Sequence, residues 1–254
     1  VELLVCDLDG VVYLGDDGIA GSGEALTRIA AQGIGLVFVT NNSTKTPHEV
    51  AAKIVATSGY PADPADVVTS AEVTAARLAG KAASAFVVGG AAIDAALAAV
   101  GIEVTTDWTR AEAVVVGLDR NLTYDRLAEA TLALRNGAAF YATTTDATYP
   151  TPQGQLPGGG VMVAALVVAS GVAPIVSGKP EAAMRDYIAS RTDGSVLAVG
   201  DRPETDIAMA RASGWASALV LTGATESLEE VPAEFAPNVV VGSLGDLAAK
   251  LPGG

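Results

Sequence analysis

Short, continuous apolar runs recur along this chain, and segments with helical spacing separate them. Examples are residues 3–6, 35–39, 196–199 and 239–241. A strand that is apolar on both faces is typical of a parallel sheet with helices on both sides, because an antiparallel sheet usually leaves one face to water. The 254 residues suffice for one large α/β domain or two smaller ones. We therefore predict an α/β protein whose parallel sheet has right-handed crossovers.

The first apolar run ends in two carboxylates, Asp7 and Asp9, and Gly10 follows them. Alternate residues of a strand point the same way, so both carboxylates can face one side. Ligands of open α/β sheets lie at the carboxyl ends of the strands. Two like charges are unfavourable there unless a cation or a proton intervenes. The motif alone is equally compatible with a polar strand end followed by a turn.

Three further strand ends carry polar residues, and in a parallel sheet all four ends would share one edge. They are Thr40 with Asn41, then Lys179, then Asp201 with Asp206. The hydroxyl and amide run from Thr40 could bind an anion or cap the next helix. One lysine cannot neutralise four carboxylates, whereas Mg²⁺ accepts oxygen ligands of this kind. An aspartate, Mg²⁺ and a lysine around an anion pocket are suited to phosphoryl transfer.

The middle of the chain has strand and helix patterns of its own. We expect residues 80–174 to form an inserted α/β domain, and residues 1–79 and 175–254 to form one split core.

Composition narrows the partners and the compartment. The net charge of −14 argues against nucleic acid or an anionic membrane as the main partner, so a small anionic substrate would need a few placed cations. The single cysteine, Cys6, allows no internal disulfide and fits a reducing cytosol. No apolar run approaches the length of a membrane span, and a strand expected from residue 2 leaves no room for a signal peptide. We expect a cytoplasmic protein.

Four motifs together resemble one enzyme family. They are Asp7-Leu8-Asp9-Gly10-Val11, Thr40-Asn41-Asn42-Ser43-Thr44, Gly178-Lys179-Pro180 and Gly200-Asp201-Arg202-Pro203-Glu204-Thr205-Asp206. In this order they resemble the haloacid dehalogenase-like (HAD) superfamily, and more narrowly its class IIA phosphatases, the NagD and 4-nitrophenylphosphatase group. The resemblance implies a Rossmann-like parallel-sheet HAD core with an inserted α/β cap domain of the type that defines class IIA.

The resemblance also implies a role for each motif. The chain would be a Mg²⁺-dependent phosphomonoester hydrolase in which Asp7 attacks phosphorus to form an aspartyl-phosphate and Asp9 acts as general acid and base. Thr40, Asn41 and Lys179 would hold the phosphoryl oxygens. Mg²⁺ would be bound by Asp7, the backbone carbonyl of Asp9, and Asp201, while Asp206 would be a ligand, directly or through water, or a brace for its loop.

The resemblance implies that the cap selects the substrate. Residues 142–148 resemble a substrate-facing loop of the family, with Thr144 where relatives have asparagine. Asp146 keeps the acid of that loop, either to line the site or to form a turn, and Arg202 could meet a substrate anion or lie on the surface. The substrate would be a small phosphorylated metabolite, with the glycerol 3-phosphate and phosphoglycolate types favoured. A homodimer through the cap is suggested by relatives, and a phosphotransferase or mutase and a catalytically silent metabolite-binding module remain as alternatives.

Overall fold

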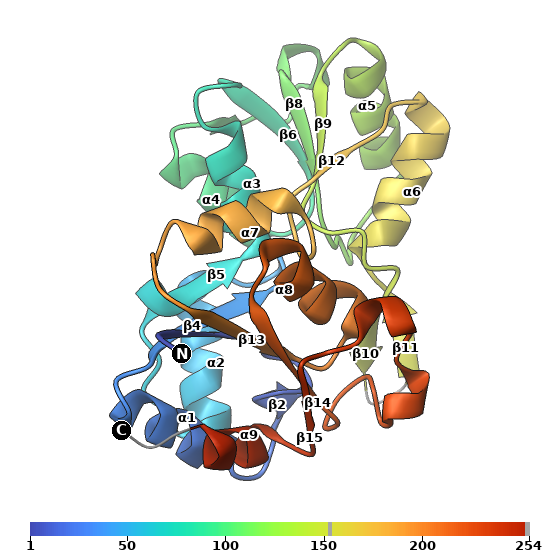
Figure 1. The fold of residues 1–254 in the computed structure, drawn as a ribbon. Helices are drawn as coiled ribbons and strands as arrows, with labels where there is room; N and C mark the ends of the chain where they lie inside the picture. The colour runs from blue at the N-terminus through green and yellow to red at the C-terminus, as the bar shows by residue number, and fades with distance from the viewer. Residues whose placement is uncertain (152–153, 252–254) are drawn as a thin grey trace. The chain divides into compact units, whose positions relative to one another are not determined.

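The computed structural model describes residues 1–151 and 154–251, which divide into two α/β units. Unit 1 comprises residues 1–40, 47–68 and 185–254, and unit 2 comprises residues 41–46 and 69–184. Each unit has a sheet of parallel strands with helices packed against it (Figure 1). The predicted α/β class is therefore confirmed.

The sheet of unit 1 has the strand order β15-β14-β13-β1-β4-β5. Its strands are β1 (Leu3–Cys6), β4 (Gly35–Thr40), β5 (Val67–Thr69), β13 (Val196–Gly200), β14 (Ala216–Val220) and β15 (Val239–Val241). β1 lies between β13 and β4, in a register that pairs Leu3 with both Val196 and Gly35. This central position explains why every residue of β1 is buried and apolar.

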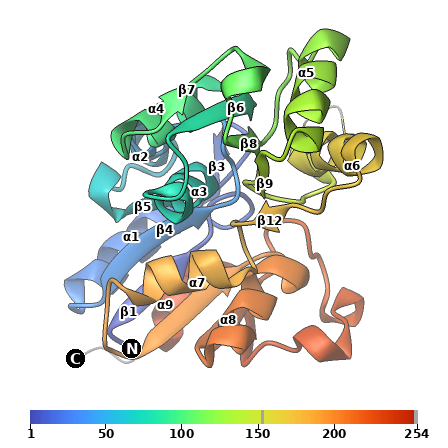
Figure 2. The ribbon, with the colours of Figure 1, turned by 90° about the horizontal axis from the view of Figure 1, so that it is seen from above.

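Three helices cover one face of this sheet, α1 (Ser22–Ala31), α2 (Pro47–Ser58) and α9 (Leu244–Lys250). They bury Leu26, Ile54 and Leu247 in one apolar cluster with Phe38 of β4. Helix α8 (Ala208–Ser213) lies on the opposite face (Figure 2). The remaining elements are β2 (Tyr13–Leu14), β3 (Asp17–Gly18), α7 (Ala182–Ala189), the 3-10 turns η1 (Pro64–Asp66), η4 (Leu228–Glu230) and η5 (Ala233–Phe235), and the π-helical turn η3 (Pro203–Ile207).

Unit 2 contains a second parallel sheet, of order β12-β9-β8-β6-β7. Its strands are β6 (Ser84–Val88), β7 (Glu103–Val104), β8 (Ala113–Val116), β9 (Ala139–Ala142) and β12 (Ile175–Val176). The strict alternation of a strand is visible in β8, where Ala113 and Val115 enter one apolar cluster and Val114 and Val116 enter another. Both faces are therefore buried.

Two pairs of helices bury these faces. α3 (Ser70–Leu78) and α4 (Ala91–Ala99) pack on one face, and α5 (Tyr124–Arg135) and α6 (Gly159–Ser170) pack on the other (Figure 2). An antiparallel hairpin, β10 (Thr148–Thr151) and β11 (Gly154–Pro157), precedes α6. This hairpin is not predicted from the sequence, because Pro150 and Pro157 are both unfavourable in a strand.

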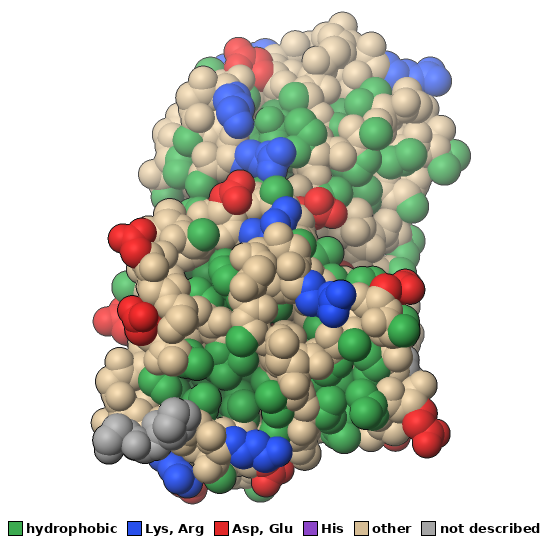
Figure 3. All heavy atoms as spheres, in the orientation of Figure 1, with side chains coloured by type: hydrophobic (Ala, Val, Ile, Leu, Met, Phe, Trp, Pro, Cys, Tyr) green, Lys and Arg blue, Asp and Glu red, His purple; other side chains and the backbone are tan. Residues whose placement is uncertain are grey.

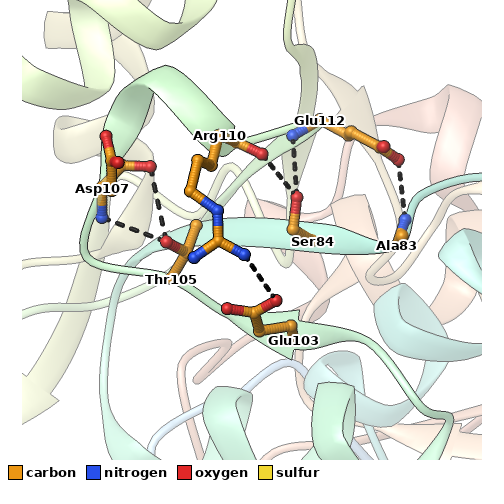
Figure 4. A network of polar contacts seen from close by, with 7 residues as sticks. All are labelled: Ala83, Ser84, Glu103, Thr105, Asp107, Arg110 and Glu112. Atoms are coloured by element: carbon orange, nitrogen blue, oxygen red, sulfur yellow. Dashed lines mark hydrogen bonds and ion pairs between the residues drawn. The ribbon is translucent and has the colours of Figure 1, made fainter.

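A polar network joins β6, β7 and the 3-10 turn η2 (Trp108–Arg110) in unit 2 (Figure 4). Ser84 Oγ donates to the carbonyl of Arg110 at 2.6 Å, and the Arg110 guanidinium pairs with Glu103 at 3.0 Å. Glu112 accepts a 2.7 Å bond from the backbone N–H of Ala83. These contacts tie the start of β6 to the segment before β8.

On the face drawn in Figure 3, basic and acidic side chains are interspersed among apolar ones. No helix within residues 1–151 and 154–251 combines the length and the apolar character that crossing a membrane requires.

Candidate active site

Asp7 and Asp9 follow the central strand of unit 1. The backbone N–H of Asp7 donates to Val199 at 2.9 Å, so Asp7 still belongs to the hydrogen-bond ladder of the sheet. The chain then turns tightly, and the N–H of Gly10 donates to the carbonyl of Tyr13 at 2.7 Å. Asp7 is buried and Asp9 is half-buried. The structure thus places both carboxylates at the carboxyl end of β1, as predicted.

The carboxylates of Asp7, Asp201 and Asp206 come together in a buried cluster. One oxygen from each lies within 4.8 Å of the others, and the three residues are 8%, 4% and 2% exposed, respectively. Three like charges in a low-dielectric site need a cation or protons to be stable. A set of oxygen ligands alone suits a hard divalent cation such as Mg²⁺. The residues therefore fit a metal ion, and the cluster could hold one.

Hydrogen bonds from neighbouring loops hold Asp201 and Asp206 in place. Asp201 accepts a bond from the backbone N–H of Ala224 at 2.6 Å, and its carbonyl accepts one from Thr225 Oγ1 at 2.7 Å. Asp206 accepts a bond from the backbone N–H of Arg202 at 3.1 Å. These contacts orient both carboxylates and show that Asp206 also braces its own loop.

The loop after β14 is a part of the site that sequence reasoning missed. Besides holding Asp201, it places Thr222 Oγ1 at 2.5 Å from the carbonyl of Gly10. A Cβ at Gly10 or at Gly223 would meet the Asp201 carboxylate, so both glycines permit a close approach. The signal was the sequence Thr222-Gly223-Ala224-Thr225 directly after an apolar run, at the same sheet edge as the other motifs.

Tyr13 lies beside these acids. Burial raises the pKa of its hydroxyl above the ordinary value, and the charges of Asp9 and Asp7 raise it further. Lys53 Nζ lies 3.9 Å from the centre of the Tyr13 ring. Tyr13 is thus a neutral side chain beside the acids.

The remaining predicted residues are distributed over the two units. Thr40 is buried at the end of β4 in unit 1. Arg202 is half-buried in unit 1, with its guanidinium 3.8 Å from Glu204. Asn41 and Lys179 belong to unit 2. The carboxylate of Asp9, whose expected contribution to the metal is its carbonyl oxygen, is not in the three-carboxylate cluster.

One structural expectation was wrong. The strand before Lys179 does not lie in the same sheet as the strands before Asp7, Thr40 and Asp201, because β12 pairs with β9 in the sheet of unit 2. Its two residues carry no local signal that could distinguish one parallel sheet from another.

Unit 2 brings Lys179 together with three other residues that the sequence analysis assigned to the site, Asn41, Thr144 and Asp146. Asn41 bonds to the main chain of Lys179 and to Asp146. Thr144 is buried, and its Oγ1 accepts a bond from the backbone N–H of Asp146 at 3.1 Å. Residues far apart in the chain therefore form one polar cluster at the carboxyl ends of β9 and β12.

Comparisons with known proteins agree with this architecture. Residues 4–103 match the model of the haloacid dehalogenase-like hydrolase family, and residues 176–247 match the HAD-hydrolase-like family model. The chain is 37% identical over 236 residues to an acid sugar phosphatase of Staphylococcus aureus, which covers 91% of this chain and 90% of the relative.

A mycobacterial relative is also similar in sequence. D-glycerol 3-phosphate phosphatase of Mycobacterium tuberculosis is 41% identical over 238 residues, covering 92% of this chain, and the chain spans 66% of that protein's length. A crystal structure of the glycerol phosphate phosphatase of that organism in complex with magnesium matches with a TM-score of 0.90 and 40% identity, covering 97% of this chain and 76% of that one. With its Rossmann-like core, inserted parallel α/β cap and clustered aspartates, the chain belongs to the HAD-like hydrolases, as a phosphatase of class IIA.

Proposed function

We propose that this protein hydrolyses the phosphate monoester of a small metabolite through an aspartyl-phosphate on Asp7, with Mg²⁺ as cofactor. The observation that carries the proposal is the buried cluster of Asp7, Asp201 and Asp206, with Asp9 two residues beyond Asp7. A carboxylate nucleophile needs its charge offset before it can approach an anionic phosphate. Mg²⁺ bound by the three carboxylates would supply positive charge for this purpose.

The proposed chemistry has two steps. A carboxylate oxygen of Asp7 attacks phosphorus, the bond from phosphorus to the ester oxygen breaks, and Asp9 donates its proton to the leaving alcohol. Asp9, now ionised, takes a proton from water as the water oxygen attacks phosphorus. The phosphorus–oxygen bond to Asp7 then breaks, which releases inorganic phosphate and restores both residues. The half-buried position of Asp9 suits a group that exchanges protons with a leaving alcohol and with water.

We assign the other motifs by the same reasoning. Thr40 and Lys179 are the proposed ligands of the phosphoryl oxygens, which gain negative charge in the transition state. Residues 1–79 and 175–254 are the proposed catalytic core, and residues 80–174 are the proposed cap that selects the ester. This division makes turnover depend on the core motifs and substrate choice depend on the cap.

The proposed substrate is a small polyol phosphate of the glycerol 3-phosphate type. Support comes from the two relatives, which are named D-glycerol 3-phosphate phosphatase and acid sugar phosphatase. Rates on glycerol 3-phosphate, phosphoglycolate and a hexose phosphate would show whether the preferred leaving group is a polyol, a hydroxy acid or a sugar.

The test is phosphate release from these esters by wild type, Asp7→Asn and Asp193→Asn, each with Mg²⁺ or with EDTA. Asp193 is an acid of unit 1 outside the cluster, so its variant is a matched control. Release that requires both Mg²⁺ and Asp7, and survives in Asp193→Asn, supports the hydrolase. Transfer of the phosphoryl group to an added alcohol without free phosphate would identify a transferase or mutase. Mg²⁺-dependent binding without either reaction would identify a binding module.

A further inference from the structure

The side chain of Asn41 holds the main chain of Lys179. Its Oδ1 accepts a hydrogen bond from the backbone N–H of Lys179 at 2.7 Å, and its Nδ2 donates to the carbonyl of the same residue at 3.2 Å. One carboxamide thus binds both polar groups of one residue, as a neighbouring strand would. Gly178 permits this contact, because a Cβ there would lie 2.6 Å from Asn41 Oδ1.

Asp146 takes the remaining hydrogen of the same amide. Asn41 Nδ2 donates to Asp146 Oδ2 at 3.1 Å, and Thr144 holds the turn by accepting the backbone N–H of Asp146. A carboxamide has only two N–H donors, and here one is directed to Lys179 and the other to Asp146. The amide orientation follows from its partners, since only an oxygen can accept the Lys179 N–H. The side chain of Asn41 therefore has no donor left for a phosphoryl oxygen.

The main chain of Asn41 is held as well. Its carbonyl accepts a 2.7 Å bond from Ser70 Oγ at the start of α3. Two residues further on, Ser43 Oγ accepts a 3.1 Å bond from Thr143 Oγ1. The backbone that carries Asn41 is thus held in place, which a residue needs if it is to fix another.

We propose that Asn41 and Asp146 are positioning residues that fix Lys179, the proposed phosphate ligand. The inference rests on the proposed function and deepens it, because it gives Asn41 and Asp146 a different task from the phosphate-binding and cap-lining roles expected from the sequence. Asp146 orients the Asn41 amide, and the amide fixes the backbone from which the Lys179 side chain extends. Through Lys179, both residues then influence the binding of the phosphoryl group, which every ester shares, and not the choice of leaving group.

The experiment compares Asp146→Ala, which removes the acceptor, with Asp146→Asn, which keeps an oxygen that can accept from Asn41. The first readout is calorimetric binding of inorganic phosphate to the Mg²⁺-loaded protein. The second is kcat/KM for glycerol 3-phosphate and for p-nitrophenyl phosphate. We expect Asp146→Ala to weaken phosphate binding about tenfold and to lower kcat/KM by the same factor for both esters. Asp146→Asn should restore most of the loss, and Asp125→Asn, an exposed acid on α5, should have no effect.

Two outcomes would overturn the inference. In the first, Asp146→Ala leaves phosphate binding intact and changes the preference between the two esters, which would place Asp146 against the leaving group. In the second, Asn41→Asp leaves phosphate binding intact, although it loses both amide donors and adds a carboxylate beside Asp146. If wild type binds no phosphate and hydrolyses no ester, the proposed function itself fails, and this is a distinguishable result. Circular dichroism of each variant, compared with wild type, checks that the protein is folded.

Discussion

The three clustered carboxylates should make the metal-free protein less stable than a variant that lacks one of them. Replacing Asp201 by asparagine removes one charge, while the amide oxygen can still accept the bond from Ala224. Two unit charges 4.8 Å apart repel by about 3.5 kcal/mol at an effective dielectric constant of 20. Removing Asp201 abolishes two such pairs, or about 7 kcal/mol if all three acids are ionised.

Proton uptake limits this gain. A carboxyl group with an ordinary pKa near 3.9 can be protonated at pH 7 at a cost of about 4 kcal/mol, so the repulsion relieved by the substitution cannot exceed about that amount. We expect Asp201→Asn to raise the free energy of unfolding of the metal-free protein by about 1–4 kcal/mol. The transition temperature of unit 1 should rise by roughly 2–4 °C for each kcal/mol.

The assay is thermal unfolding in EDTA and in saturating Mg²⁺. The chain has two tryptophans, Trp215 in unit 1 and Trp108 in unit 2, so a Trp108→Phe background lets fluorescence report unit 1. Mg²⁺ should stabilise wild type by mass action and leave Asp201→Asn nearly unchanged, which reverses their order. The reasoning is refuted if Asp201→Asn is the less stable protein in EDTA, or if Mg²⁺ stabilises both equally. Asp193→Asn is again the matched control.

Two further substitutions test the local geometry. Gly10→Ala should lower Mg²⁺ affinity at least tenfold in calorimetry, because Gly10 has a φ of 80° and a Cβ there would meet Asp201. Gly15→Ala is the control. Gly15 also has a positive φ, of 58°, but an added Cβ would meet nothing within 4 Å, so the Mg²⁺ affinity should not change. Asp107→Ala should destabilise the protein at pH 7, because hydrogen bonds from the Thr109 hydroxyl and N–H hold the pKa of Asp107 below its usual 3.8. A carboxyl group whose pKa is lower in the folded than in the unfolded protein stabilises the fold at pH values above its unfolded pKa, and this stability is lost as the pH falls through its folded pKa. The difference in free energy of unfolding between wild type and Asp107→Ala, measured in urea, should therefore narrow from pH 5 to pH 3. A difference that stays constant over this range would contradict the prediction.

Much of the fold and of the carboxylate cluster could be predicted from the sequence, because the signals are local. A central strand such as β1 must be apolar on both faces, and residues directly after such strands must lie at one edge of a parallel sheet. This reasoning places Asp7, Thr40 and Asp201 at the same edge of a parallel sheet, each at the end of its own strand, whereas the pairing of β1 with β13 comes from the structure. It depends on the sequence periodicity of each strand and on no knowledge of its partner.

The tertiary structure decided which sheet each short strand joins and what each amide and hydroxyl bonds to. β12 has two residues and pairs with β9, so Lys179 belongs to unit 2 together with Asn41, which is 138 positions away in the chain. The hydrogen bond from Thr225 Oγ1 to the carbonyl of Asp201 likewise joins residues that are distant in the sequence. Strand pairing and side-chain hydrogen bonds depend on all the partners that the folded chain brings within reach. Many of these partners are distant in the sequence, so a local stretch of sequence cannot predict which one is chosen.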